Sequence, residues 1–340
     1  MHVAFLVPGP LETISGGYGY DRRMLAGLRA AGHSVDIIAL GGRHPAADEA
    51  ARAAARQAWK NLPPGTLPII DGLGLPAFDG VDLSRALGII HHPTALETGL
   101  DEPTRATRKA TERRLMSALS RVIVSSAPTG EQLAQDFGVD PTRIRVVEPG
   151  TDAAPRCPGS GLDCCHLLAI GTLVPRKGHD LLLRALARLF DLDWRLTIVG
   201  SAAADPVHAH GLAALAEELG IATRVRFAGE VVDAALEALW QSADIFALAT
   251  HWEGYGMAIA EALKRGLPVA ITGGGAAGAL VPSEAGVVCP PGDLEQLSKA
   301  LRRLIFSREL RAYLAENAWQ TGQALPTWDD QARAFAAALA

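Results

Sequence analysis

The chain has 340 residues, of which 49% are hydrophobic, 20% charged and only 5% aromatic. At roughly 100–200 residues per domain, this length predicts two domains, each able to bury its own core. The composition argues against a disordered chain. The formal net charge of −5 argues against a nucleic-acid partner held by bulk positive charge.

The sequence shows no clear sign of a membrane span, a signal peptide or a disulfide scaffold. No apolar run reaches the roughly 18 residues of a membrane span, and the opening MHVAFLVPGP lacks the basic region of a signal peptide. Four cysteines are too few for a disulfide scaffold. We therefore expect an α/β protein of the reducing cytoplasm.

Short apolar runs alternate with longer helical patterns along the chain. Strands are expected at 2–7, 34–40, 67–70, 86–90, 121–126, 143–147, 166–171, 194–200, 224–229, 244–249 and 267–272. Helices are expected at 18–31, 46–60, 104–119, 129–137, 179–190, 206–219, 233–242, 257–265, 293–306, 308–319 and 327–339. This alternation is typical of parallel βαβ units, and the apolar strands predict sheets covered on both faces. The stretch 148–165, rich in proline, glycine and small residues, reads as a linker between two Rossmann-like halves.

Ligands of open parallel sheets bind beyond the carboxyl ends of the strands, so the residues that follow each strand carry the functional signal. Gly16 and Gly17 follow the first strand and precede a helix, where backbone N–H groups can approach an anion. His91 follows the strand at 86–90 and can donate a hydrogen bond or act as an acid or base. A flexible turn and a packed histidine are the alternatives.

Two cations precede a helix in the second half. Arg176 and Lys177 lie just ahead of the helix expected at 179, where the helix dipole prefers anions. The pair is explained if an anion binds between them, and a diphosphate fits the arginine fork and the lysine charge. A solvated pair remains the alternative.

The strongest signal is a pair of glutamates separated by seven residues. Glu253 lies in a loop and Glu261 in the next helix, and Gly254, Tyr255, Gly256 and Met257 lead into that helix. The backbone N–H groups there predict a phosphate cradle. Carboxylates accept well from sugar hydroxyl pairs, so we assign the transferred sugar to Glu253 and a ribose to Glu261. An N-cap residue and a solvated helix glutamate are the alternatives. The glycines at 273–275 permit close approach of a ligand, or simply a mobile loop.

Together these motifs resemble the retaining glycosyltransferases of family 4, the glycosyl transferases group 1, over nearly the whole chain. The resemblance implies the GT-B fold, in which two Rossmann-like, doubly wound domains face a central cleft. It implies an acceptor domain at 1–150, a nucleotide-sugar donor domain at 151–320, and a C-terminal helix at 321–340 that crosses back to the first domain, with Trp328 where it crosses.

The resemblance also implies roles for individual residues. His91 is similar to the family's active-site histidine near the transferred sugar, and Arg176 and Lys177 to the basic segment that binds the donor diphosphate. Glu253 and Glu261 match the motif whose first glutamate contacts the donor sugar and whose second contacts the ribose. The remaining donor-binding candidates are Gly16, Gly17, Gly171, Val231, Gly254, Tyr255, Gly256 and Met257.

Two departures from the family pattern bear on the donor site. Thr172 stands where many members have an arginine that touches the phosphates, so Arg176 and Lys177 must supply more of that charge. The stretch 275–278 has alanines and glycines where many members have a glutamate after the late glycine pair. One contact that this glutamate makes in the family, to the donor or to the backbone, therefore has no residue assigned to it here.

The function expected is transfer of a hexose from a UDP- or GDP-sugar to an acceptor hydroxyl with retention, by a hexosyltransferase (EC 2.4) that needs no metal or other cofactor. The one D-x-D, Asp191 to Asp193, precedes a strand at the far end of the sheet, so it reads as a turn. A sugar-nucleotide epimerase of the same fold and a non-catalytic nucleotide-sugar-binding protein are the alternatives. A dinucleotide dehydrogenase is disfavoured, because neither half has an intact G-x-G-x-x-G.

The acceptor is not named by the sequence and could be a saccharide, a lipid-linked molecule or a small molecule. Arg105, Lys109 and Arg113 form a basic stripe on an expected helix. Peripheral contact with the inner face of the membrane and an ordinary solvated face both explain it.

Overall fold

The computed structural model describes residues 1–339, which divide into two compact units. The first unit comprises Met1–Gly150 together with the residues from Pro326 on, and the second comprises Thr151–Leu325. Within the described range each unit contains a six-stranded sheet whose strand pairs are parallel. The prediction of two Rossmann-like parallel sheets is therefore confirmed.

The first sheet has the strand order β2-β1-β3-β4-β5-β6. Its strands are β1 (His2–Pro8), β2 (Ser34–Leu40), β3 (Leu67–Asp71), β4 (Leu87–Ile90), β5 (Arg121–Val124) and β6 (Ile144–Val146). The helices of this unit are α1 (Gly16–Ala30), α2 (Glu49–Lys60), α3 (Glu102–Ala118), α4 (Ala127–Phe137) and α11 (Trp328–Leu339). Ser15 caps α1 by accepting a hydrogen bond from the backbone N–H of Tyr18.

The second sheet has the order β12-β11-β10-β7-β8-β9. Its strands are β7 (Cys165–Ile170), β8 (Trp194–Val199), β9 (Val225–Gly229), β10 (Ile245–Leu248), β11 (Val269–Thr272) and β12 (Gly286–Cys289). The helices are α5 (His179–Ala187), α6 (Pro206–Glu218), α7 (Asp233–Gln241), α8 (Met257–Lys264), α9 (Leu294–Phe306) and α10 (Arg308–Gln323). Strand β12 was not expected from the sequence.

Each sheet has an apolar core on both faces. In the second unit, Leu182 of α5 and Leu301 of α9 pack in one cluster, while Ile259 and Leu263 of α8 belong to another. The first unit likewise has two clusters, one of which includes Phe335 of α11. Burial on both faces explains why most strands read as continuous apolar runs and not as alternating patterns.

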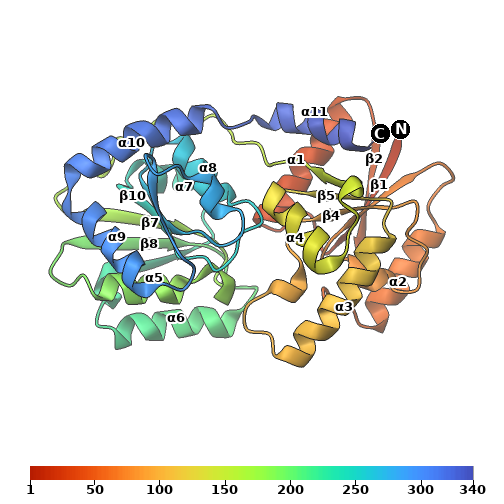
Figure 1. Ribbon diagram of the computed structural model, residues 1–340, viewed down its shortest axis with the longest axis horizontal. Coiled ribbons are helices and arrows are strands. Elements are labelled where there is room, and N and C mark those ends of the chain that lie inside the picture. The colour runs from red at the N-terminus through yellow and green to blue at the C-terminus, as the bar shows by residue number, and fades with distance from the viewer. Residues whose placement is uncertain (340) are drawn as a thin grey trace. The chain divides into compact units, whose positions relative to one another are not determined.

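The chain's last helix belongs to the first unit. Helix α11 packs against α1, and Figure 1 shows the two helices side by side. The contact is close, since a Cβ atom on Gly27 would lie 2.3 Å from the Cβ of Ala332. The return of a C-terminal helix to the N-terminal part of the chain is confirmed. It begins at Trp328, because α10 continues to Gln323.

A separate point concerns membranes. Among residues 1–339, the structure contains no helix with the length and apolar character that crossing a bilayer requires.

Candidate functional site

The second unit places its charged candidates where the strand order reverses. Strand β7 lies between β8 and β10, so the chain winds away from it in both directions. Ligands of open α/β sheets bind at such a switch point, beyond the carboxyl ends of the strands. Arg176 and Lys177 follow β7, and Glu253 follows β10, so all three come from the two loops that flank this point.

These three residues form one ion-pair network. Lys177 Nζ lies 2.7 Å from Glu253 Oε1, and Arg176 Nη1 lies 3.9 Å from Glu253 Oε2. Arg176 also donates to the backbone carbonyl of Trp252 at 2.7 Å, and the Thr250 hydroxyl donates to Glu253 Oε1 at 2.9 Å. The sequence predicted the cations and the carboxylate but not their mutual contact.

The network holds Glu253 ionised. Burial by itself would raise the pKa of this carboxyl group, but Lys177 and Arg176, together with the hydrogen bond from Thr250, lower it below its ordinary value. The side chain of Glu253 is 8% exposed, and those of Arg176 and Lys177 are each 17% exposed. A charged ligand that binds the two cations therefore has to compete with Glu253 for them.

The glycines at 273–275 pack against the loop that carries Glu253. A Cβ atom on Gly274 would lie 2.1 Å from the carbonyl oxygen of His251, and one on Gly275 would lie 2.2 Å from that of Glu253. The backbone N–H of Glu253 donates to the carbonyl of Gly274 at 3.0 Å. These glycines let two backbone segments meet, and in this structure the close approach is to the Glu253 loop. The sequence had suggested a ligand or a mobile loop.

The backbone between the two glutamates leads into α8. Gly256 precedes the helix with a φ of 109°, which favours glycine, and Met257 is its first residue. Tyr255 is buried and Gly254 partly buried. Glu261 lies within α8, where burial, with a smaller contribution from Asp152, raises its pKa to about 7.

Two further donor candidates lie near other strand ends. Gly171 follows β7, and a Cβ atom there would lie 3.2 Å from Cδ of Lys177, so the glycine leaves room for the lysine stem. Its carbonyl accepts from Nε2 of the buried His179 at 3.2 Å. Val231 follows β9 and is partly buried against the neighbouring apolar cluster.

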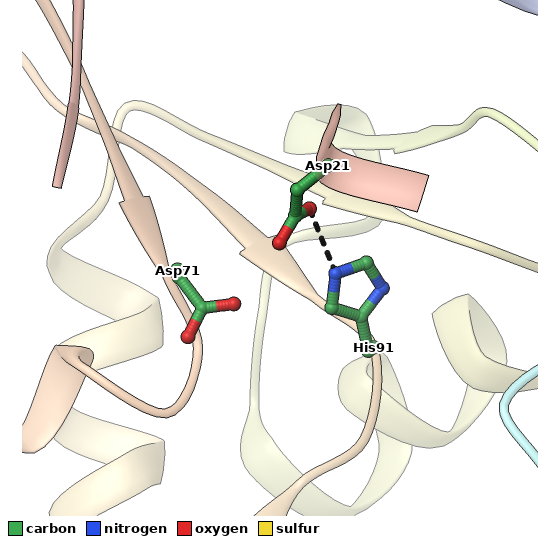
Figure 2. Close-up of side chains that lie close together, drawn as sticks. All are labelled: Asp21, Asp71 and His91. Carbon is green, nitrogen blue, oxygen red and sulfur yellow. Dashed lines mark hydrogen bonds and ion pairs between the residues drawn. The ribbon is translucent and has the colours of Figure 1, made fainter. Parts of the chain in front are cut away.

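The first unit contains a second cluster, centred on His91. This residue directly follows β4, and its Nε2–H donates to Oδ1 of Asp21 in α1 at 2.9 Å. Asp71 is the last residue of β3. Figure 2 shows the carboxylates of Asp21 and Asp71 and the imidazole of His91 turned toward one another. Gly17 lies against the ring, since a Cβ atom there would be 3.0 Å from His91 Cδ2.

Burial and mutual proximity shift the pKa values of this cluster. Burial, reinforced by the neighbouring Asp21, raises the pKa of Asp71 to about 7. Burial alone would lower the pKa of His91, but the charge of Asp21 and its hydrogen bond raise it above the ordinary value. The cluster thus favours a protonated imidazole that donates Nε2–H to Asp21.

Asp21, Asp71 and His91 also have the donor composition of a cation site, with one ligand atom of each within 4.8 Å of the others. Nε2 of His91 already donates to Asp21, so in this structure His91 and Asp21 are joined by a hydrogen bond. The D-x-D lies in a turn before β8, where Asp191 pairs with Arg302 at 2.7 Å.

Sequence reasoning missed Asp21 and Asp71. The signal for Asp21 was an acid on the buried face of a helix, three and four residues before Met24 and Leu25. The signal for Asp71 was an acid that directly ends the apolar strand LPII. Both are polar residues in places that packing normally reserves for apolar ones.

The basic stripe of α3 is largely paired. Arg105 lies 3.8 Å from Glu102 and donates to the carbonyl of Ala95, and Lys109 lies 3.3 Å from Asp136. Exposed ion pairs of this kind are common on solvated helix faces.

Comparisons with known proteins agree with this organisation. The family model described as glycosyltransferase family 4 matches residues 20–155, and the model described as glycosyl transferases group 1 matches residues 165–321. Two similar curated proteins are D-inositol 3-phosphate glycosyltransferases. The one from Thermomonospora curvata is 30% identical over 253 residues, covering 67% of this chain and 58% of the relative. The one from Geodermatophilus obscurus is 32% identical over 234 residues, covering 64% and 52%. The chain spans somewhat more than half the length of these relatives.

Solved structures share the fold. The sucrose-phosphate synthase of Thermosynechococcus elongatus has a TM-score of 0.80 at 20% identity and covers 97% of this chain and 96% of its own. Anabaena HepE, solved in complex with UDP and glucose, has a TM-score of 0.74 at 18% identity, with 98% of both chains covered. With one family model on each half and GT-B proteins as structural neighbours, this chain belongs to the family 4, or group 1, glycosyltransferases.

Proposed function

We propose that this chain is a retaining glycosyltransferase that transfers a hexose from a UDP- or GDP-sugar to an acceptor hydroxyl. Family membership supports the reaction class, and the UDP and UDP-glucose complexes of Anabaena HepE make UDP the first nucleotide to test. The observation that carries the proposal is the network of Arg176, Lys177 and Glu253 at the switch point of the second sheet.

The chemistry follows from where negative charge develops. As the bond between the anomeric carbon and the diphosphate oxygen breaks, charge accumulates on the leaving diphosphate. Arg176, Lys177 and the backbone N–H groups at the start of α8 stabilise it, which is usually the largest catalytic contribution. The acceptor oxygen forms its bond to the same face of the anomeric carbon, and its proton passes to the leaving diphosphate. No step requires a metal ion.

The remaining candidates bind the donor. Glu253 accepts hydrogen bonds from hydroxyls of the transferred sugar, and Glu261 from those of the ribose. His91 hydrogen-bonds the transferred sugar and orients it. The backbone near Val231 lies beside the nucleobase, and Gly16 and Gly17 belong to the same donor-binding set.

The acceptor and cellular setting follow less directly. The relatives are named for D-inositol 3-phosphate, so an inositol phosphate is the first acceptor to assay, ahead of saccharides and lipid-linked acceptors. We place the reaction in the cytoplasm. Binding at the inner membrane face would need cations of α3 beyond those paired with Glu102 and Asp136.

The first experiment is a thermal-shift screen with UDP, GDP, ADP and their sugars, because a ligand that binds the native state raises its melting temperature. Transfer is then measured with the stabilising donor, with and without EDTA, and the anomeric configuration of the product is determined by NMR. Lys177→Ala and Glu253→Ala should each reduce kcat/KM at least about 100-fold.

Lys299→Ala is the matched control, because Lys299 pairs with Glu295 at 2.6 Å on an exposed surface of the same unit. Near-normal turnover in Lys177→Ala or Glu253→Ala would refute the assignment. Interconversion of the donor sugar without an acceptor would establish the epimerase alternative. Nucleotide-sugar binding without transfer or hydrolysis would establish a non-catalytic binding protein.

A further inference from the structure

The hydrogen bond between His91 and Asp21 fixes which ring nitrogen carries a proton. An ionised carboxylate only accepts hydrogen bonds, so the contact of 2.9 Å requires the proton on Nε2. Nδ1 points away from Asp21 (Figure 2) and makes no hydrogen bond to the described residues. Asp21 is fully buried, whereas the His91 side chain is 23% exposed. The nitrogen left available to a ligand is therefore Nδ1.

We propose that Asp21 is a positioning residue, which holds His91 as an imidazolium with Nε2–H on the carboxylate and Nδ1–H available to donate to a hydroxyl of the transferred sugar. This rests on the proposed function only for the identity of the ligand. The pairing and the charge are properties of the free protein.

Packing fixes the orientation of the ring. One side of His91 lies against Gly17, where a Cβ atom would be 3.0 Å from Cδ2 and 3.5 Å from Nε2. The Tyr20 ring meets the imidazole edge-on, with centroids 5.2 Å apart. A side chain at position 17 would press against the ring that bonds Asp21, so the ring or the backbone would have to shift slightly. This gives Gly17 a purpose beyond the anion contact that the sequence suggested.

The other groups around His91 favour the cation. Asp21 comes from α1 and Asp71 from β3, and both raise the pKa of His91. Tyr18 and Tyr20, also from α1, stay neutral because burial raises their pKa values. The pKa of Asp71 is itself raised to about 7, so Asp71 supports the imidazolium mainly above that pH, where it is ionised. Oδ2 of Asp21 has no hydrogen-bond partner among the described residues.

The direct test is a histidine NMR titration of the protein without substrates. Ring ¹⁵N shifts, with His91 identified by the signal lost in His91→Gln, should show a proton on Nε2 at every pH and a pKa above the ordinary histidine value. In Asp21→Asn the pKa of His91 should fall below that of the parent. The matched control is Asp36→Asn, because Asp36 bonds His2 at 2.7 Å at an exposed site and should leave the His91 titration unchanged.

Activity provides the second readout. Asp21→Asn should lower kcat about 10- to 100-fold with a smaller change in KM, as loss of a partner that orients a functional histidine does in metal sites. In the pH profile of kcat, the alkaline limb of this variant should also lie at lower pH than that of the parent, because the protonated ring is the active form.

A neutral Nδ1–H tautomer, or a His91 pKa that does not change in Asp21→Asn, would overturn the proposal even if the enzyme is active. If Asp21→Asn fails to fold, the parent's ring shifts still decide the tautomer and the charge. If the parent protein shows no sugar transfer, the proposed function is refuted, but the NMR result on His91 still holds.

Discussion

Lys177→Met tests whether the buried network in the second unit stabilises the fold. The substitution keeps the aliphatic length and removes the charge 2.7 Å from Glu253. At that distance and an effective dielectric constant of 20, the gross attraction is about 6 kcal/mol. The variant retains Arg176 at 3.9 Å and the Thr250 hydroxyl. Because breaking a buried pair leaves an uncompensated charge, we expect a loss of about 3 kcal/mol in the free energy of unfolding at pH 7.5.

The pH dependence of that loss follows from the sign of the pKa shift. In the parent, the pKa of Glu253 is lowered, so its contribution is present above the unfolded-state pKa and is lost only as the pH falls through the lower folded-state pKa. In Lys177→Met burial should dominate and raise the pKa, so protonation relieves the penalty as the pH falls. The difference between parent and variant should therefore narrow from pH 7.5 toward pH 4.5.

The assay is urea unfolding followed by tryptophan fluorescence at several pH values, with Lys299→Met as the control. Lys299 and Glu295 form an exposed pair, whose loss should leave the unfolding midpoint unchanged. A difference under about 0.5 kcal/mol for Lys177→Met, or one that does not vary with pH, would refute the reasoning.

Three further predictions concern other parts of the molecule. Gly274→Ala should cost about 1–3 kcal/mol in unfolding free energy, because its Cβ would lie 2.1 Å from the His251 carbonyl. Gly211→Ala, in α6 with nothing within 4 Å, should instead stabilise by up to about 1 kcal/mol, and equal effects in urea unfolding would contradict this account. Nucleotide affinity measured by calorimetry should rise from pH 6 to pH 8 as Glu261, whose pKa is about 7, ionises to accept from the ribose, and the rise should disappear in Glu261→Gln. Vesicles containing anionic lipid should pellet little protein even at low salt, since Arg105 and Lys109 are paired with Glu102 and Asp136; strong, salt-sensitive pelleting would show that these pairs give way to lipid.

The sequence predicted the fold well because strand and helix periods are local signals. It identified the alternating elements of both halves, yet it missed β12, a four-residue strand with no helical pattern close before it. Short strands are hard to recognise, since a run such as GVVC can equally be a loop. The prediction also ended the helix expected at 308–319 too early, because α10 continues to Gln323.

The candidate site was predicted as a set of residues but not as a set of contacts. Glu253 and Lys177 are 76 positions apart, and their ion pair depends on β7 and β10 being neighbours in the sheet. Single-sequence reasoning treated the cations and the carboxylate as partners of different ligand groups. Asp21 was not predicted as a site residue for a different reason, because a lone acidic residue in a helix usually faces solvent.

The position of Tyr20 links the histidine cluster to the end of the chain. Its ring contacts His91 on one side and, on the other, Trp328 and Phe335 of α11, each with centroids 6.4 Å away. A chain truncated after residue 325 would expose Tyr20 and let its ring move. The imidazole of His91 would then lose the packing contact that holds it on that side. Truncations and C-terminal tags should therefore spare the last helix, because a change there would reach a residue 237 positions earlier in the sequence, counting from Trp328 to His91.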